Sequence, residues 1–207
     1  MFITLEGPDG SGKSMQVPAL SEYIRSLGYQ VLTTREPGGT FIGDQIREVI
    51  MRMDNTSMHP RTEILLFCAA RAQIVAEVIR PALEQGVVVI SDRYADSTLA
   101  YQGYGHGIDL GILRQILSFA TGGLTPDLTL LFDLDVETGL SRRQSGGGEW
   151  NRLDDYAVAF HRRVRNGYLE LAAAEPARWV RIDAAQTPVR VREDLQQVIL
   201  ARLGTRS

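Results

Sequence analysis

The chain has 207 residues, of which 44% are hydrophobic and 23% are charged, and its formal net charge is −3. These fractions are close to those of average globular proteins, so they argue against a disordered, fibrous or membrane protein. Because the chain as a whole is slightly acidic, we do not expect it to bind nucleic acid. Phosphate recognition must then come from locally grouped arginines. The length suits a single domain, and we expect residues 1–207 to form one.

The cellular setting is indicated by the cysteine content and by the N-terminal residues. The single cysteine, Cys68, cannot form an intramolecular disulfide and fits a reducing compartment. No charged leader precedes a long apolar stretch, and no run of about 18 apolar residues occurs. We therefore expect a cytoplasmic protein that does not bind membranes and whose partner is a small molecule.

Short apolar runs alternate with longer segments of helical periodicity. The predicted strands are Phe2–Leu5, Gln30–Thr33, Val87–Ser91, Leu128–Leu134 and Trp179–Ile182. The predicted helices are Lys13–Leu27, Phe41–Met53, Thr62–Gln85, Leu110–Thr121, Leu153–Glu175 and Val189–Leu203. Pro81 falls inside the third helix and is expected to kink or split it. The alternation predicts an α/β fold with a parallel sheet covered by helices.

A phosphate-binding motif lies between the first predicted strand and the first predicted helix. Its residues match the pattern G-x-x-x-x-G-K-[ST] and are Gly7, Pro8, Asp9, Gly10, Ser11, Gly12, Lys13 and Ser14. Lys13 is the only lysine of the chain, a compact charge that suits the β- and γ-phosphates of a nucleotide. The hydroxyl of Ser14 suits Mg²⁺. A tight turn with an exposed lysine is the alternative, which the strand, loop and helix context disfavours.

The lysine count also narrows the class of nucleotide-binding protein. A GTPase switch of the Ras type reads guanine with an Asn-Lys-x-Asp element, for which this chain has no second lysine. A protein kinase needs a different glycine-rich loop and a strand lysine of its own. A small-molecule phosphotransferase is therefore the leading class.

Further motifs follow the phosphate loop in a fixed order along nearly the whole chain. With that loop they comprise Glu6–Ser14, Thr34–Thr40, Phe67–Arg71, Ser91–Tyr94 with Ser97 and Tyr101–Gly103, and Arg152–Asp154. Together they resemble the nucleoside monophosphate kinases, specifically the bacterial thymidylate kinase family. The resemblance implies the three-layer P-loop NTPase fold, with a five-stranded parallel sheet flanked by helices, a lid at about residues 141–152, and a homodimer. It implies transfer of a phosphoryl group from ATP to dTMP, giving dTDP and ADP for dTTP synthesis, with Mg²⁺ as cofactor.

Residues at the predicted strand ends resemble the family's acceptor-phosphate site. Arg93 resembles the arginine that holds the acceptor phosphate, which agrees with its place at the carboxyl end of a strand. Asp92 resembles the acidic residue that orders Mg²⁺ through water. Asp9 resembles a carboxylate near acceptor and metal. Arg35 and Pro37 match the segment that approaches the acceptor nucleotide, although Arg35 alone could be a surface residue.

The resemblance assigns the base of the acceptor to a predicted helix and its sugar to the segment that follows Asp92 and Arg93. Phe67 and Arg71 are four residues apart and share a helix face. By themselves they favour a core phenylalanine with a solvated arginine, whereas the resemblance implies that Phe67 stacks on thymine and Arg71 bonds its O4 edge. Tyr101 resembles the aromatic residue that crowds a ribose 2′-hydroxyl. Ser97, Thr98 and Gln102 are expected to line the same neighbourhood.

The lid segment concentrates arginines around a glycine-rich run. In the family, a catalytic arginine comes either from the phosphate loop or from the lid, and this loop contains none. Arg143 and Arg152 are therefore the candidates, with Lys13, Arg93 and Asp9 as the other expected catalytic residues. Asp154 resembles an acidic residue that points at the acceptor.

Two other functions stay open at this point. One is a kinase for a different nucleoside or nucleoside monophosphate. The other is a nucleotide-dependent regulatory protein, which would have no reason to carry the acceptor-side residues Arg35, Phe67, Arg71, Arg93 and Tyr101.

Overall fold

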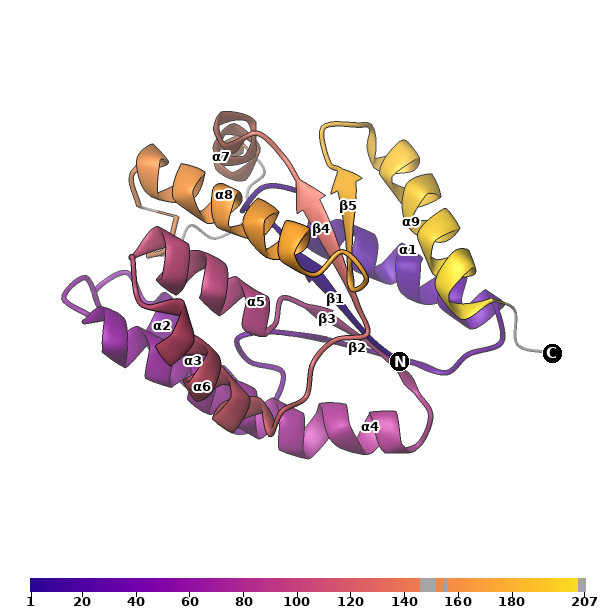
Figure 1. The fold of residues 1–207 in the computed structure, drawn as a ribbon, viewed down its shortest axis with the longest axis horizontal. Helices are drawn as coiled ribbons and strands as arrows, with labels where there is room; N and C mark the ends of the chain where they lie inside the picture. Colours follow the sequence, from indigo (N-terminus) through magenta and orange to yellow (C-terminus); the bar gives the residue numbers. More distant parts are fainter. Residues whose placement is uncertain (146–151, 155, 205–207) are drawn as a thin grey trace.

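The computed structural model describes residues 1–145, 152–154 and 156–204 (Figure 1). Its strands are β1 (Phe2–Glu6), β2 (Val31–Arg35), β3 (Val88–Asp92), β4 (Leu128–Asp133) and β5 (Trp179–Asp183). Its α-helices are α1 (Lys13–Ser26), α2 (Phe41–Met51), α3 (Pro60–Ile74), α4 (Arg80–Glu84), α5 (Ala95–Thr98), α6 (Leu110–Thr121), α7 (Val136–Ser145), α8 (Val158–Ala174) and α9 (Pro188–Leu203). Two π-helical segments, η1 (Val75–Ile79) and η2 (Leu99–Gly105), continue α3 and α5.

The five strands form one parallel sheet in the order β2-β3-β1-β4-β5. Strand β1 lies at its centre, so the chain leaves the middle of the sheet where the phosphate loop begins. The register places Asp92 beside both Leu5 and Arg35. In open α/β sheets ligands bind beyond the carboxyl ends of the strands, and three segments with predicted site residues start at this edge. The predicted fold class is confirmed.

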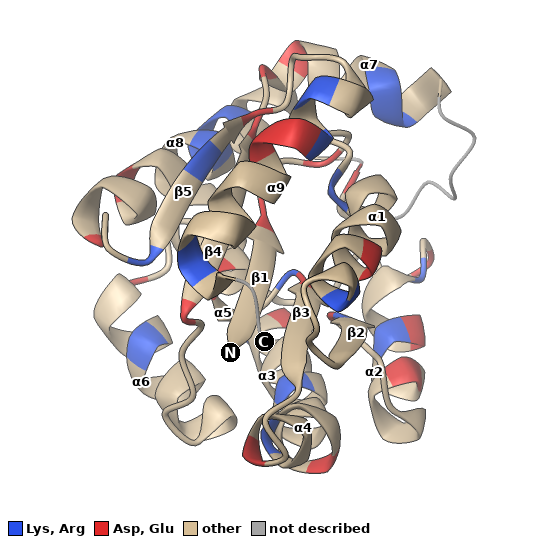
Figure 2. Cartoon of the chain, turned by 90° about the vertical axis from the view of Figure 1, so that its right-hand side faces the viewer, with Lys and Arg blue, Asp and Glu red and all other residues tan. Residues whose placement is uncertain are grey.

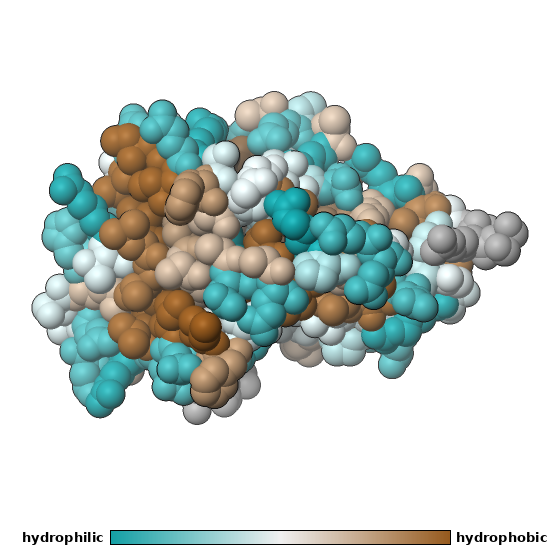
Figure 3. All heavy atoms as spheres, turned by 90° about the horizontal axis from the view of Figure 1, so that it is seen from below, coloured by the Kyte–Doolittle hydropathy of each residue, from teal (hydrophilic) through white to brown (hydrophobic). Residues whose placement is uncertain are grey.

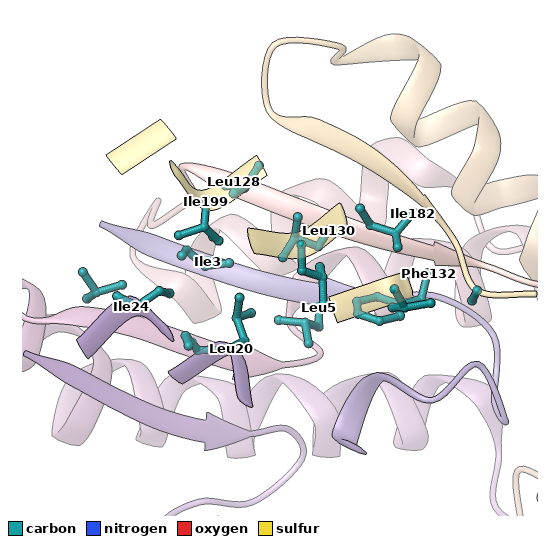
Figure 4. Close-up of a cluster of buried hydrophobic side chains, with 14 of the residues drawn as sticks. Ile3, Leu5, Leu20, Ile24, Leu128, Leu130, Phe132, Ile182 and Ile199 are labelled. Carbon is teal, nitrogen blue, oxygen red and sulfur yellow. The ribbon is translucent and has the colours of Figure 1, made fainter. Parts of the chain in front are cut away.

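One face of the sheet packs against α1 and α9 (Figure 1). Alternate residues of β1 and β4 point to this side, as the period of two in a strand requires. Figure 4 shows Ile3 and Leu5 of β1 beside Leu130 and Phe132 of β4, with Leu20 and Ile24 of α1 and Ile199 of α9 above and below them. All seven side chains are at most 2% exposed, so this layer fixes the helix that follows the phosphate loop.

The opposite face carries two further hydrophobic clusters. The larger one joins α3, η2, α6 and α8 to β4 and β5, and includes Cys68, Leu113 and Tyr168. The smaller one joins η1 and α4 to β1 and β3 around Phe2 and Val89. The larger cluster holds both α3 and η2 against the sheet, and these two elements carry the predicted base and sugar contacts.

Several boundaries differ from the predicted ones. The long third helix is interrupted as Pro81 led us to expect: η1 widens the helix directly before α4, and Pro81 lies in the first turn of α4, where its missing N–H needs no partner. The predicted start of α8 at Leu153 is wrong. The helix begins at Val158, because Asp154 lies in a turn and its carboxylate binds Arg143. Helices α5 and α7 and the segment η2 were not predicted.

Candidate active site

A cavity of about 710 Å³ opens at the carboxyl edge of the sheet. Predicted site residues that line it are Asp9, Gly10, Ser11, Gly12, Lys13, Ser14, Arg35, Pro37, Phe67, Arg71, Asp92, Arg93, Ser97, Thr98, Tyr101, Gln102 and Arg143. Gly7 and Pro8 belong to the phosphate loop and contribute carbonyl groups to it. Arg152 and Asp154 do not line this cavity. One cavity therefore brings together almost all of the residues that the sequence assigned to donor and acceptor.

The phosphate loop is held by backbone contacts that only glycine allows. Gly10 has a φ of 74°, and a Cβ at this position would collide with the backbone of Gly139 in α7. Gly7 has a φ of 138°, and a Cβ there would collide with the carbonyl of Phe132 in β4. The loop thus fits between β4 and α7, and its amide groups are brought to the N-terminus of α1, which is a favourable place for phosphate.

Lys13 lies folded back along this loop. Its Nζ donates hydrogen bonds to the carbonyls of Gly7 (2.9 Å) and Pro8 (2.8 Å) and to Oγ of Ser11 (3.1 Å). Burial, and next the charge of Arg93, lower the pKa of Lys13 to about 8. An anionic phosphate beside the ammonium would favour its charged form, so the site is suited to an anion.

Arg93 is the centre of the hydrogen-bond network between β1, β3 and η2. One terminal nitrogen donates to Oγ of Ser97 (3.1 Å) and to the hydroxyl of Tyr168 (3.1 Å), and the other donates to Oδ1 of Asp9 (2.5 Å) and to the hydroxyl of Tyr101 (3.2 Å). The φ of Arg93 is 71°, an uncommon backbone conformation for a side-chain-bearing residue. Such conformations cluster at functional sites, where the surrounding contacts hold them.

The carboxylate of Asp9 is charged in this network. Burial acts to raise its pKa, but Arg93 and then Lys13 outweigh burial and lower the pKa to about 2. The hydroxyl of Tyr101 donates to Oδ2 of Asp9 at 2.5 Å, and the guanidinium of Arg93 lies 5.2 Å from the centre of the Tyr101 ring. Asp9 and Tyr101 therefore fix Arg93 from two sides.

Glu6 binds two of the residues that contact Arg93, namely Ser97 and Tyr168. It was not predicted as a site residue. It is fully buried at the end of β1 and accepts hydrogen bonds from the backbone N–H of Tyr94 (2.8 Å), from Ser97 (2.6 Å) and from Tyr168 (2.9 Å). Burial and the nearby Asp96 raise the pKa of Glu6 to about 7. Its position directly before the glycine-rich loop is the only sequence signal that pointed to it.

Arg71 is buried and not the solvated tip that its helix pattern alone favoured. The side chain is 1% exposed, its Nε pairs with Glu36 (2.7 Å), and its terminal nitrogens donate to Thr98 (3.1 Å) and to the carbonyl of Tyr94 (3.1 Å). Phe67 is partly buried and lines the same cavity one helical turn earlier. A ring and a fixed guanidinium thus face one space, as the pair needs to do in order to hold a flat base.

The two lid arginines have different surroundings. Arg143, in α7, lines the cavity and forms an ion pair with Asp154 (3.0 Å). Arg152 is 7% exposed, pairs with Glu63 of α3, and donates from Nε to the carbonyl of Ile50 (3.1 Å). Of the predicted lid, residues 146–151 lie outside the described residues, and residues 141–145 belong to α7.

The oxygen groups expected to hold a metal are partly assembled. The hydroxyl of Ser14 donates a short hydrogen bond to the carboxylate of Asp92, so these two oxygens lie together beside the phosphate loop. Asp9 instead binds Arg93 and Tyr101. Among the described residues, no group of three or more His, Cys, Asp or Glu is placed to hold a metal. A hydroxyl and one carboxylate fit Mg²⁺, which usually combines one or two carboxylates with substrate phosphates and water.

Comparison with known proteins decides among the kinase classes. The family model for thymidylate kinase matches residues 5–195. The chain belongs to the thymidylate kinase family. A thymidylate kinase of Roseiflexus sp. strain RS-1 is 49% identical over 96% of this chain and 93% of that protein. The thymidylate kinase of Deinococcus radiodurans is 49% identical over 100% of this chain and 97% of that protein. A crystal structure of thymidylate kinase from Ehrlichia chaffeensis has a TM-score of 0.78 and 33% identity, covering 96% of this chain and 98% of that one.

Membership of the thymidylate kinase family makes the chain a kinase that uses ATP, and such kinases generally need a divalent metal. None of the helices in the described part of the chain has the length and apolar character of a membrane span. Cavity residues that the sequence did not indicate include Arg47, Arg142 and Gln186. Arg47 and Gln186 lie outside the recognised motifs, whereas Arg142 belongs to the predicted lid but was not a candidate for the site.

Proposed function

We propose that this chain transfers the γ-phosphoryl group of ATP to dTMP, giving ADP and dTDP, a step toward dTTP. The observation that carries the proposal is the single cavity in which the phosphate loop faces Arg93, Arg71 and Phe67. A phosphate loop alone would serve a switch or a motor as well. The buried Arg71, the partly buried Arg93 and the ring of Phe67 supply a place for a second, acceptor nucleotide.

The two substrates occupy opposite ends of this cavity. The donor end runs from the phosphate loop to Arg142, to Gln186 and to Pro188 at the start of α9. A terminal nitrogen of Arg142 donates to the carbonyl of Ala184 (2.9 Å). The acceptor end runs from Arg93 to Arg71 and Phe67. This arrangement supports Arg93 as the residue that binds the acceptor phosphate, because it lies next to the phosphate loop.

The reaction needs alignment and charge neutralisation, and no general base. A phosphate monoester has a second pKa near 6, so the acceptor oxygen is already an anion at neutral pH. Arg93, fixed by Asp9 and Tyr101, holds that phosphate in line with the donor. Lys13 and the loop amide groups stabilise the charge that spreads over the transferring group.

Mg²⁺ is the divalent metal that we propose for this site. Ser14 and Asp92 would hold it, Asp92 through water, and Asp9 is a further candidate on the acceptor side. When bound, the metal neutralises charge on the donor phosphates. Its requirement is tested by loss of activity with a chelator and recovery on addition of Mg²⁺.

Arg143 is the lid arginine that the geometry favours as the one that contacts the transferring phosphoryl group. It lines the cavity, and the hydrogen bond that it donates to Asp154 raises its pKa, so Arg143 stays charged. Arg152 is held by Glu63 away from the cavity lining and would have to leave that pair in order to act. Closure over the substrates would also keep water from competing as acceptor.

We further propose a cytoplasmic homodimer whose one domain comprises residues 1–207. Large apolar side chains are exposed on α3 and α6, namely Leu65 (59%), Ile112 (55%) and Phe119 (91%). Figure 3, which views the molecule from below, shows hydrophobic side chains gathered on part of this face. A second copy of the chain would cover them. In the view of Figure 2, basic and acidic segments are interspersed over the elements, which supports a small-molecule partner and not nucleic acid.

The test is ADP production with ATP and Mg²⁺ against dTMP, dUMP, ribose TMP, dCMP, AMP and GMP, with a reaction lacking acceptor. We expect selective turnover of dTMP, and poor turnover of ribose TMP because Tyr101 crowds the 2′ position. Selective turnover of another monophosphate would reject the base assignment. Hydrolysis of ATP that is independent of any acceptor would reject the transfer reaction and favour a regulatory protein.

A further inference from the structure

Gln102 of η2 lines the acceptor end of the cavity and is held by a buried acid. Its Nε2 donates to Oε1 of Glu63 at 2.8 Å, and the two residues are only 2% and 1% exposed. A carboxylate can only accept hydrogen bonds, so it selects the NH₂ side of the Gln102 amide. The carbonyl oxygen of that amide is thereby turned away from Glu63. No residue in the described ranges donates a hydrogen bond to this oxygen.

Arg71, which lines the same side of the cavity, is also oriented by a buried carboxylate. Its Nε is held by Glu36, and one terminal nitrogen donates to Thr98, which lies one helical turn before Gln102. These bonds use three of the five N–H groups of the guanidinium and leave one on each terminal nitrogen. The wall therefore offers donors at Arg71 and an acceptor at Gln102.

Donors at Arg71 and an acceptor at Gln102 are complementary to the hydrogen-bonding edge of thymine, but not to that of cytosine. Thymine presents an acceptor at O4 and a donor at N3–H, whereas cytosine presents an NH₂ donor at position 4 and an acceptor at N3. We propose that Glu63 is a positioning residue that orients the amide of Gln102 so that its oxygen accepts the base N–H, and thereby sets the preference for thymine over cytosine. The inference rests on the proposed kinase activity, but assigns a role to a residue outside the cavity lining.

The second carboxylate oxygen of Glu63 explains why this orientation is stable. It pairs with Arg152, which also donates to the carbonyl of Ile50 and to the hydroxyl of Tyr156. Burial acts to raise the pKa of Glu63, but the nearby His106 and the hydrogen bonds from Arg152 and Gln102 outweigh it and lower the pKa, so the carboxylate stays charged. One oxygen is thus committed to Arg152, and the other accepts from Gln102 at 2.8 Å and lies 3.6 Å from Nε2 of His106.

The deciding substitution is Glu63→Gln. Arg152 only donates, so the carbonyl oxygen of the new glutamine is expected to turn to Arg152 and its NH₂ group to Gln102. Gln102 must then present its own oxygen to residue 63 and its NH₂ group to the base. We expect KM for dTMP to rise and the ratio of kcat/KM for dTMP over dCMP to fall roughly tenfold or more, while KM for ATP stays within about twofold.

A matched control is available on the surface. Gln73 donates to Glu77 at 2.8 Å in an exposed pair of the same chemistry. Glu77→Gln should leave the dTMP to dCMP ratio unchanged. In a background of Gln102→Ala, Glu63→Gln should have no further effect on that ratio, because the group it orients is gone. An unchanged ratio in folded, dTMP-active Glu63→Gln, or an equal effect in both backgrounds, would overturn the proposal.

The unmodified protein offers a second measurement that does not depend on a variant folding. In ¹⁵N-labelled protein, the side-chain NH₂ signals of Gln102 should be shifted and slow to exchange because of the bond to Glu63, and they should keep that character when dTMP is added. If dTMP releases them, Glu63 does not orient the amide and the inference fails. Failure of the parent protein to phosphorylate dTMP would instead reject the proposed function, so the two failures are distinguishable.

Discussion

Asp9 and Arg93 are joined at 2.5 Å between Oδ1 and a terminal guanidinium nitrogen, although 84 residues separate them in the chain. Asp9 lies in the loop that binds the donor phosphates, and Arg93 lies beyond β3 on the acceptor side. The pair therefore sets the distance between the two halves of the site, and Tyr101 closes it by bonding to both residues.

Replacing Asp9 with Asn should loosen this connection. The amide keeps the shape but loses the charge that faces Arg93, and its NH₂ group opposes either the guanidinium or the Tyr101 hydroxyl. We expect kcat/KM for dTMP to fall about tenfold or more with KM for ATP little changed, as measured by steady-state kinetics. Asp54→Asn, which breaks the exposed pair with Arg52, is the control and should be neutral. Equal kinetics in both variants would contradict a positioning role for Asp9.

Arg143→Ala should slow the transfer step far more than it weakens ATP binding. A charge-stabilising arginine contributes about 10³ to 10⁵ in rate in related phosphoryl transfers, and we expect a loss of at least about 100-fold in kcat. Hydrolysis of ATP relative to transfer should rise. Arg152→Ala tests the other candidate, and Arg162→Ala, in an exposed pair with Glu137, is the control. Turnover at the parent rate in both lid variants would remove the lid-arginine assignment.

The raised pKa of Glu6 predicts how the free energy of unfolding depends on pH. Its pKa is raised from 4.5 to about 7 in the folded chain, so between these values the folded state binds more protons than the unfolded state. The free energy of unfolding should therefore fall as pH rises from about 5 to 7, with a contribution of at most about 1.4 kcal/mol per pH unit. Asp9, with a pKa lowered to about 2, acts with the opposite sign and only below about pH 4.

Urea unfolding at several pH values measures this contribution. In Glu6→Gln the carboxyl group is absent, and the slope between pH 5 and 7 should become flatter than in the parent protein. All other ionisable groups are present in both proteins, so the difference between the two slopes isolates Glu6. Parallel curves for the two proteins would show that Glu6 does not carry the effect.

Alanine substitutions at Gly10 and Gly12 of the phosphate loop distinguish the cost of backbone strain from the cost of a steric clash. Both have a positive φ, of 74° and 84°, but only at Gly10 does an added Cβ meet other atoms, those of Gly139. Alanine at either position costs roughly 1 to 2 kcal/mol from the left-handed backbone. Gly10→Ala should lose clearly more free energy of unfolding than Gly12→Ala. Equal losses would mean that α7 moves away from the loop at little cost.

The sequence predicted the layers and most of the cavity because these depend on local patterns. Strand runs, the glycine-rich loop and the motif around Arg93 are each readable within a few residues. Glu6, Glu63 and Tyr168 were missed because their roles arise from contacts between residues that lie 39 to 162 positions apart, such as Tyr168 with Glu6. The burial of Arg71 could likewise not be predicted from its own helix, since its partner Glu36 comes from another segment. The π-helical segment η2 was not predicted because its seven residues show little hydrophobic periodicity.

The solitary lysine at the phosphate loop gives this enzyme an unusual chemical simplicity. Lys13 is its only side-chain amine, and a pKa lowered to about 8 leaves a sizeable uncharged, nucleophilic fraction near neutral pH. A reagent that acylates amines would therefore modify one side chain, inside the donor site, and ATP should protect it. Attachment of an amine-reactive dye at Lys13, in contrast to attachment at the N-terminal amine, is correspondingly coupled to inactivation, whereas the 21 arginines remain unmodified.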